Sequence, residues 1–343
     1  MIVILLLIMI FGLALLSYLL LFNGRFFSRQ SAVIEAPIDF IAEDLSDLSN
    51  WPNWLPWLIF EPDAEVTYEY LNSGILSVLP SCLVWRGVLI KEGYISLEPA
   101  RSSAHYFHTL LEAPAFYPSD VHFNINLTKQ KKRTSVTIQI TGKLPFFKRW
   151  KQGNYRIRAN KDAELALLKI LAYLSKYNTT SDHDYKAPSF EWLAKTTLDT
   201  VDAVTRPFVV SNQPMSQKMD QGFHDLLTDL GPENPPAGPS FALYKKVDLA
   251  HHYFSGRLGI PVQNLVPCPL CPERIVLHGH YLHLRYVGSY QHLSLAWHVL
   301  YSFMRLHKLK VNRRRYGVET FEVGPLQTNS SKDFVTLVCL PIK

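Results

Sequence analysis

His283–Val323, HLRYVGSYQHLSLAWHVLYSFMRLHKLKVNRRRYGVETFEV, predicts a strand, an amphipathic helix and a second strand. The helix is indicated by apolar residues that recur at helical spacing and therefore share one face. These residues are Leu293, Trp297, Leu300, Tyr301 and Met304. The second strand carries an acid, Glu319, between Val318 and Phe321, where strands usually have apolar or neutral residues. Such a carboxylate, close to aromatic residues, is either a solvated strand residue or the polar anchor of a pocket.

The same order of elements occurs earlier in the chain. Arg206–Val247 also predicts strand, helix and strand, with Phe223 at the place of Trp297 and Tyr244 at the place of Phe321. Each half needs a further strand, and the sequence offers His251–Leu258 and Phe334–Pro341. A tandem βαββ duplication would bury one face of each helix on a shared sheet and leave a groove between the halves.

Several short motifs of this region match a known family. They are Gly238-Pro239, Phe241–Tyr244, Asp248, Tyr286–Tyr290, Ala296-Trp297, Val318–Phe321 and the closing strand Phe334–Pro341. On these motifs, residues 205–343 resemble the GyrI-like domain, also called the AraC-type effector-binding domain. One departure is Gly324-Pro325, where the family commonly has Asp-Pro after the strand. The resemblance implies an aromatic cleft with a glutamate at its floor, which receives cationic or polar effectors.

The resemblance assigns residues to that cleft. Glu319 corresponds to the acid, and its walls correspond to Tyr290, Trp297 and Phe321. The expected geometry adds Tyr301 and Tyr244 to the same candidate ligand-binding set.

The physical case for Glu319 stands beside the resemblance. A buried carboxylate is costly unless it is paired, and a cationic ligand would supply the partner. Surrounding rings would add cation–π attraction of about 0.5–2 kcal/mol for a well-placed contact. The alternative is that Glu319 faces solvent or pairs with an arginine such as Arg285. The other half of the repeat has Ala242 at the matching place, so only one half is expected to hold the polar end of a ligand.

The N-terminal stretch, Met1–Phe22, contains no charged side chain. A bilayer core takes about 20 helical residues to cross, so residues 1–24 are expected to form an uncleaved transmembrane anchor. Arg25 and Arg29 follow this stretch, and the positive-inside rule then places the body of the chain in the cytoplasm. The expected location is the inner membrane, with a single pass.

Residues 31–178 predict an α+β domain. A short strand and a tryptophan-rich helical break precede a hairpin of alternating strands, and a long helix is expected over Asn154–Tyr177. The motifs Ile34–Pro37, Trp51–Trp57, Trp85 and Gly142–Pro145 resemble, in their order, the START-like (SRPBCC or polyketide cyclase-like) superfamily. That resemblance implies a helix-grip fold with an apolar cavity for lipids, sterols or other hydrophobic ligands. Residues Trp54, Trp57 and Trp85 would either pack in the core or line this second cavity.

The remaining features set limits on partners and cofactors. Residues 179–204 are expected to be a linker with a short docking helix over Phe190–Val204, because apolar residues recur there at helical spacing. The net charge of +6 is spread along the chain without a basic recognition helix, so no nucleic-acid partner is expected. Cys268 and Cys271 form a CxxC motif near His278, His280 and His283, which leaves zinc, a redox pair or a proline-stiffened loop open. No metal and no cofactor are predicted.

Taken together, the sequence predicts a membrane-anchored, non-catalytic binder of small hydrophobic or cationic molecules, acting in sensing or sequestration. One alternative is a hydrolase of strained electrophiles in which Glu319 is the general base. The other is lipid binding or transfer through the START-like cavity.

Overall fold

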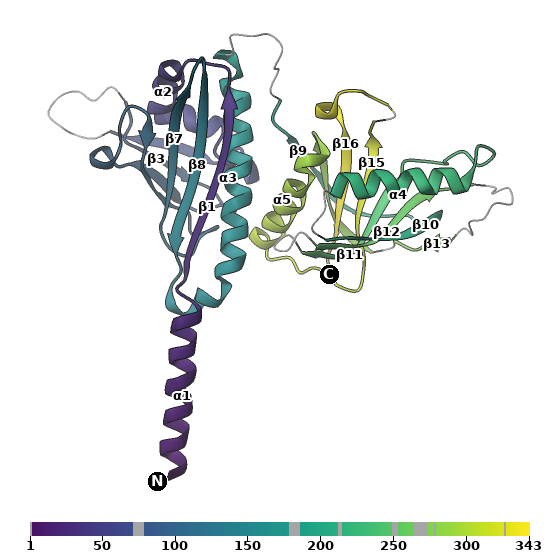
Figure 1. Cartoon of the computed structure of the whole chain (residues 1–343), viewed down its shortest axis with the longest axis horizontal. Coiled ribbons are helices and arrows are strands. Elements are labelled where there is room, and N and C mark those ends of the chain that lie inside the picture. The colour runs from purple at the N-terminus through teal and green to yellow at the C-terminus, as the bar shows by residue number, and fades with distance from the viewer. Residues whose placement is uncertain are drawn as a thin grey trace. The chain divides into compact units, whose positions relative to one another are not determined.

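The structure is a computed structural model that describes residues 2–70, 79–177, 186–211, 215–248, 253–263, 273–277, 279–325 and 327–343. Its contacts divide the chain into two units, Met1–Asp184 and Tyr185–Lys343 (Figure 1). Each unit contains one large antiparallel sheet with helices, so the α+β class predicted from the sequence is confirmed.

The apolar N-terminal run forms α1 (Ile2–Leu21). Crossing a bilayer takes about 20 consecutive apolar residues, and no helix within the described ranges is long and apolar enough for that. The prediction of a transmembrane anchor over residues 1–24, and with it a single-pass position in the inner membrane, therefore does not hold.

The first unit is built on a curved sheet with strand order β1-β8-β7-β6-β4-β3-β2, and β5 pairs with β7. The strands are β1 (Arg25–Ile34), β2 (Glu65–Glu69), β3 (Cys82–Arg86), β4 (Gly93–Leu97), β5 (Tyr106–Phe107), β6 (Thr109–Glu112), β7 (Val121–Gln130) and β8 (Arg133–Lys143). The helices besides α1 are α2 (Ile38–Ser46) and α3 (Gln152–Leu174). Short 3-10 helices are η1 (Leu48–Asn53), η2 (Leu58–Phe60), η3 (Pro99–Arg101), η4 (Phe146–Lys151) and η5 (Ser175–Tyr177).

The predicted hairpin and long helix of this unit are both present. Strands β7 and β8 alternate buried and less buried residues, and Lys131 takes a positive φ of 56° in the tight turn between them. Helix α3 runs along β1 and β8, where the Asn160 side chain accepts hydrogen bonds from Ser28 and Gln30 (Figure 1). Apolar residues of α3 and of the sheet meet in one core, because each element presents one apolar face.

The second unit has a sheet with strand order β13-β10-β12-β11-β15-β16-β14-β9. The strands are β9 (Ser189–Thr197), β10 (Val201–Val210), β11 (Phe241–Asp248), β12 (Tyr253–Pro261), β13 (Glu273–Ile275), β14 (His280–Val287), β15 (Gly317–Val323) and β16 (Val335–Pro341). The helices are α4 (Met215–Leu230) and α5 (Leu293–Leu306), with short 3-10 helices η6 (Tyr290–His292) and η7 (Ser331–Asp333).

The sheet of the second unit has the arrangement of a duplicated βαββ element. One half is β10, α4, β11 and β12, and the other is β14, α5, β15 and β16. The halves meet where β11 pairs antiparallel with β15, in a register that sets Ala242 directly opposite Glu319. These two residues also hold matching places in the repeat, so the pair marks the centre of its approximate twofold symmetry.

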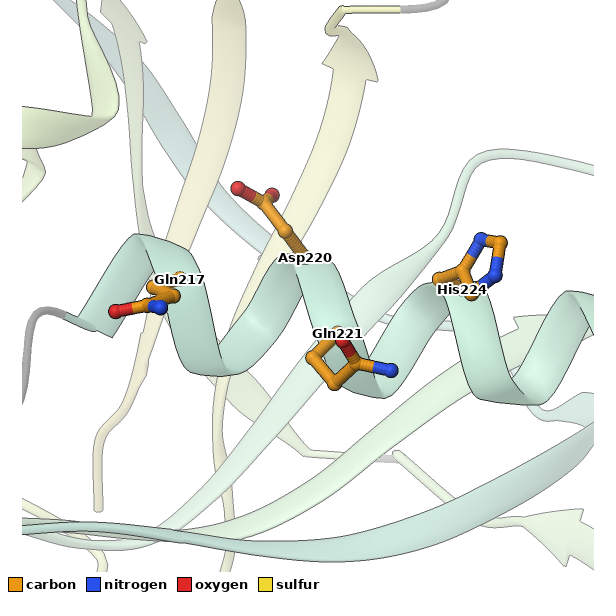
Figure 2. Close-up of a pocket in the computed structure, with 4 residues that line it drawn as sticks. All are labelled: Gln217, Asp220, Gln221 and His224. Atoms are coloured by element: carbon orange, nitrogen blue, oxygen red, sulfur yellow. The ribbon is translucent and has the colours of Figure 1, made fainter.

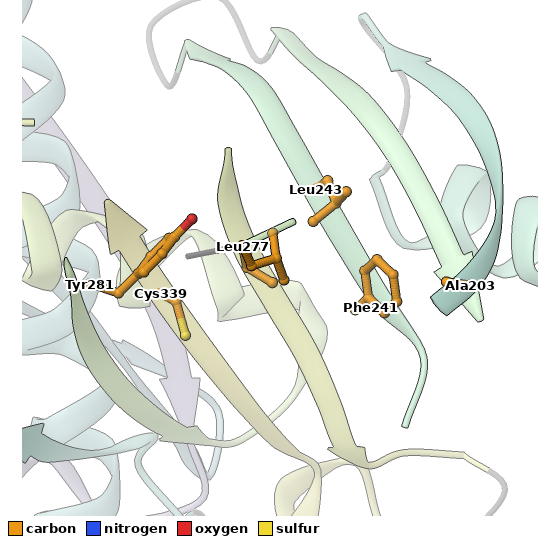
Figure 3. Packing of buried hydrophobic residues seen from close by; sticks show 7 residues of the cluster. Ala203, Phe241, Leu243, Leu277, Tyr281 and Cys339 are labelled. Carbon is orange, nitrogen blue, oxygen red and sulfur yellow. The ribbon is translucent and has the colours of Figure 1, made fainter. Parts of the chain in front are cut away.

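Alternation along these strands gives the sheet two buried faces. Ala242 and Glu319 lie on one face, and their neighbours Leu243 and Val318 lie on the other. Figure 3 shows the apolar cluster of that other face, in which Leu277 and Cys339 also take part. The sheet is therefore covered on both sides, which explains why a strand at its centre can be sealed from water.

The docking helix predicted over Phe190–Val204 is not formed. These residues form β9 and the start of β10, and β9 pairs with β14 along the edge of the sheet. A short run of apolar residues can be part of a helix or of a strand, so their spacing alone does not distinguish the two. Pairing with β14 makes this segment a strand.

Candidate functional site

Glu319 lies at the centre of the second unit and is fully buried, with no exposed surface. Its carboxylate accepts two short hydrogen bonds. The Tyr244 hydroxyl donates to Oε2 at 2.5 Å, and the Trp297 indole Nε1–H donates to Oε1 at 2.5 Å. Both donors are themselves buried, so the acid is held in an environment without water contact.

The local fold explains how these donors reach the acid. Tyr244 is two residues beyond Ala242 on β11, so it shares the face on which Glu319 lies. Trp297 comes from α5, and its ring lies against the backbone of β15. A Cβ atom added at Gly317 would come within 2.6 Å of that ring, so glycine is needed for the indole to approach.

The charge of Glu319 is not balanced by a basic side chain within the described part of the chain. Arg285, the expected alternative partner, instead pairs with Glu191 at 3.0 Å and lies 3.9 Å from Glu322. Burial raises the pKa of Glu319 from 4.5 to about 7, although the hydrogen bonds from Tyr244 and Trp297 act in the lowering direction. The acid therefore holds its proton to a higher pH than an exposed glutamate does.

The alternative of an exposed or arginine-paired Glu319 is consequently wrong. The Tyr244 hydroxyl stays protonated, because burial and the nearby carboxylate raise its pKa well above 10.0. Among the described residues, the site thus presents an acid whose hydrogen-bond partners are neutral donors.

Aromatic rings surround this acid on the helix side of the sheet. Tyr244 and Trp297 lie 5.5 Å apart between ring centroids, and Tyr301 lies 6.2 Å from Trp297. Tyr290 and Phe321 are 5.4 Å apart and only partly buried, unlike the acid itself. The structure therefore places all the residues that the sequence predicted for the ligand-binding set in one aromatic group around the acid, and Tyr290 and Phe321 are its less buried members.

Helix α4 adds two residues that the sequence reasoning did not assign to the cleft. The Phe223 ring lies 5.7 Å from that of Phe321. Asp220 acts on Tyr290, since burial, Asp220 and Glu319 together raise the pKa of the Tyr290 hydroxyl to about 12. Their spacing of three residues on a helix was the available signal, because it places both side chains on one side of α4.

A surface pocket of about 540 Å³ lies along α4 and is lined by Gln217, Asp220, Gln221 and His224. Figure 2 shows these four side chains spread along the helix. Asp220 lines this pocket and also contributes to the raised pKa of the Tyr290 hydroxyl. Glu319 does not line the pocket, which agrees with its complete burial.

The second candidate site, in the first unit, is a packed aromatic core. Trp54, Trp57 and Trp85 are all buried, and the rings of Trp57 and Trp85 stack with centroids 6.4 Å apart. The Trp57 indole donates to Asp162 at 3.2 Å, and the Tyr117 hydroxyl donates to the same oxygen at 2.6 Å. The indole N–H groups of Trp54 and Trp85 are buried, and no described residue accepts a hydrogen bond from them.

Most of the cysteine and histidine motif of the second unit lies outside the residues that the structure describes. Cys268, Cys271 and His278 lie outside the described residues. His283 is buried in β14, and burial lowers the pKa of its imidazole to about 4. Neither His283 nor His280 belongs to a cluster with metal-ligand spacing among the residues that the structure describes.

No family model and no curated protein matches the chain. Among solved structures, the C-terminal domain of EcmrR matches with 13% identity and a TM-score of 0.39, over 45% of this chain and 98% of that one. SAV2435 bound to tetraphenylphosphonium matches with 12% identity and a TM-score of 0.32, over 45% and 94%. An integron cassette protein from the mobile metagenome of Vibrio cholerae matches with 12% identity and a TM-score of 0.32, over 46% and 100%.

All three matches have identities below 25% and TM-scores below 0.5. At such low TM-scores they carry no argument about the activity of this chain. No family model or curated protein supports the START-like resemblance of residues 31–178.

Proposed function

We propose that the protein is a non-catalytic binder of small molecules that are both cationic and hydrophobic, through the cleft around Glu319. The observation that carries this proposal is a fully buried carboxylate that has only neutral hydrogen-bond donors as partners. Burying an ion without a counter-charge is costly, and that cost appears here as the raised pKa. A cationic ligand would supply the missing charge.

The surroundings of the acid suit a ligand with delocalised or shielded positive charge. Partly buried Tyr290, Phe321 and Phe223 provide ring faces that attract a cation and cover apolar surface. Asp220, whose pKa is raised by burial, adds a second negative group on the α4 side. Reaching Glu319 requires these outer side chains to move apart, because the acid has no exposed surface in the structure.

The test is a titration of the full chain with tetraphenylphosphonium, followed by tryptophan fluorescence. Trp297 donates to Glu319, so its emission reports on the site. We expect Glu319→Gln to weaken binding by more than about 10-fold, as loss of a buried charge pair costs over about 1.4 kcal/mol. Neutral triphenylphosphine oxide should bind weakly and equally to both proteins.

The matched control is Glu322→Gln, which removes an exposed charge from the same strand. It should bind tetraphenylphosphonium as the unchanged chain does. Equal affinity of the unchanged chain and Glu319→Gln would rule out the acid as the anchor.

A second candidate function is hydrolysis of strained electrophiles, with Glu319 as the general base. The observation that favours it is the pKa of about 7, which suits a base working near neutral pH. Turnover of epoxides that is lost in Glu319→Gln and kept in Glu322→Gln would support this function over simple binding. Lipid binding or transfer by the first unit stays a prediction, and the buried indole N–H groups of Trp54 and Trp85 are the feature that supports it.

A further inference from the structure

Three potential metal ligands lie side by side on neighbouring strands of the first unit. Glu98 follows β4, and its backbone N–H donates to the carbonyl of His108 at 2.9 Å, so these residues are direct neighbours. His108 precedes β6, in which Leu110 pairs with His122 of β7. His108 and His122 therefore project from the same face of the sheet, one residue pair apart.

The side chains converge from these positions. The His108 Nε2 atom lies 3.6 Å from a Glu98 carboxylate oxygen, and the two imidazole rings have centroids 4.9 Å apart. One ligand atom from each of Glu98, His108 and His122 lies within 4.8 Å of the others. Donors bound to one zinc ion at about 2.0–2.2 Å are roughly 3–4 Å apart, so side-chain rotations alone would close this set.

Two buried ring nitrogens in the cluster have no hydrogen-bond partner among the residues that the structure describes. They are Nε2 of His108 and Nδ1 of His122. Buried polar atoms are nearly always satisfied, so each such atom calls for an explanation. The other nitrogen of His108, Nδ1, lies 3.3 Å from the Tyr106 hydroxyl. If Nδ1 carries the proton and donates to Tyr106, the lone pair of Nε2 is directed into the cluster.

We propose that Glu98, His108 and His122 form a binding site for a divalent transition-metal ion of the zinc class. Two imidazole nitrogens and one carboxylate oxygen are ligands that such ions prefer over Mg²⁺ or Ca²⁺, which take oxygen ligands almost exclusively. Three protein ligands leave a coordination position for water or a small ligand, as in zinc sites that are not purely structural. The Tyr106 hydroxyl would be the outer partner that fixes the orientation of the His108 ring.

The surrounding charges define how the site should respond to change. Arg101 pairs with the same Glu98 oxygen that faces His108, at 3.2 Å, and so competes with the metal. Both side chains of that ion pair keep some exposure, so it can rearrange when a metal enters. Removing the guanidinium should consequently favour metal binding, which is opposite to the effect of removing a ligand.

The experiment is a titration of the metal-free full chain with Zn²⁺ against a chromophoric chelator, repeated with Co²⁺ to record its visible absorption. The chain also contains Cys268 and Cys271, so all proteins are prepared with both replaced by serine to exclude their contribution. We expect one bound ion per chain and Co²⁺ bands typical of a four- or five-coordinate site. His108→Gln and His122→Gln should each weaken binding by more than about 100-fold, beyond the 10–100-fold expected for loss of an outer partner.

Two further variants keep the test decisive if a ligand variant folds poorly. Arg101→Gln should bind Zn²⁺ several-fold more tightly, and His105→Gln, which removes a more exposed neighbouring histidine, should change nothing. Absence of a bound ion in the serine background would overturn the proposal. So would unchanged affinity in folded His108→Gln and His122→Gln, because the three residues would then form only a polar network on the sheet.

Discussion

Replacing Glu319 by glutamine should change how the stability of the second unit depends on pH. Burial raises the pKa of this carboxyl from 4.5 to about 7. Below pH 4.5 the acid is protonated in both the folded and the unfolded chain, so it causes no penalty. Between pH 4.5 and 7 the unfolded chain loses the proton while the folded chain keeps it, so the free energy of unfolding falls as pH rises. Above pH 7 the full penalty of the buried charge is present.

The size of the effect follows from the two pKa values. Each pKa unit corresponds to about 1.4 kcal/mol, so a rise from 4.5 to about 7 lowers stability by about 3 kcal/mol above pH 7. Glutamine does not titrate, and Glu319→Gln should gain this amount relative to the unchanged chain between about pH 4 and pH 8. The amide also alters the hydrogen bonds with Tyr244 and Trp297, but that contribution is the same at every pH.

The assay is urea unfolding of the full chain across this pH range, with the buried thiol of Cys339 as a reporter of the second unit. Cys339 lies on β16 next to β15 and is fully buried, so a brief thiol-labelling pulse read by mass spectrometry detects its unfolding. Glu322→Gln, an exposed change on β15, should follow the unchanged chain at every pH. If the free energy of unfolding changes with pH in the same way for Glu319→Gln and the unchanged chain, the reasoning is refuted, because the pKa of Glu319 is then not raised by folding.

Three other outcomes follow from the same structure. In urea unfolding, Gly317→Ala should lower the free energy of unfolding by about 1–3 kcal/mol, because the new Cβ would lie 2.6 Å from the Trp297 ring. The control Gly238→Ala, whose new Cβ has its nearest contact at 3.7 Å, should leave that free energy nearly unchanged. Asp162→Asn should cost the first unit about 1–3 kcal/mol, since an amide group would face two buried donors, and unchanged thermal unfolding would contradict this. Tetraphenylphosphonium affinity should rise from pH 5 through the pKa of about 7 as Glu319 loses its proton, and should level off about one pH unit above that value. A flat calorimetric profile of affinity against pH would speak against a charged anchor.

Local patterns predicted much of the second unit. The helical spacing that ends at Met304 predicted α5, and the apolar and aromatic residues beside Glu319 predicted the strand that carries it, β15. These features depend on residues close together along the chain within one helix or strand, so they can be recognised from the sequence alone. The partners of Glu319 were only partly predictable, because Tyr244 and Trp297 come from other elements and are brought in by sheet register and helix packing.

Features that depend on pairing between distant segments were missed. The apolar spacing of Phe190–Val204 predicted a helix, but pairing with β14 makes most of this segment a strand. The cluster of Glu98, His108 and His122 has no motif spacing along the chain, and only the register of β4, β6 and β7 brings it together. Sequence reasoning therefore expected no metal ligands there.

The pairing of Ala242 with Glu319 has a consequence for how the repeat could diverge. A residue at the centre of a twofold-symmetric sheet faces its own counterpart, so identical halves would set two carboxylates against each other. Like charges directly opposite across a strand pair are destabilising, and more so when both are buried. An acid at this position is compatible with the fold in one half only, so the geometry itself breaks the symmetry of the duplicated unit and limits it to one central acid.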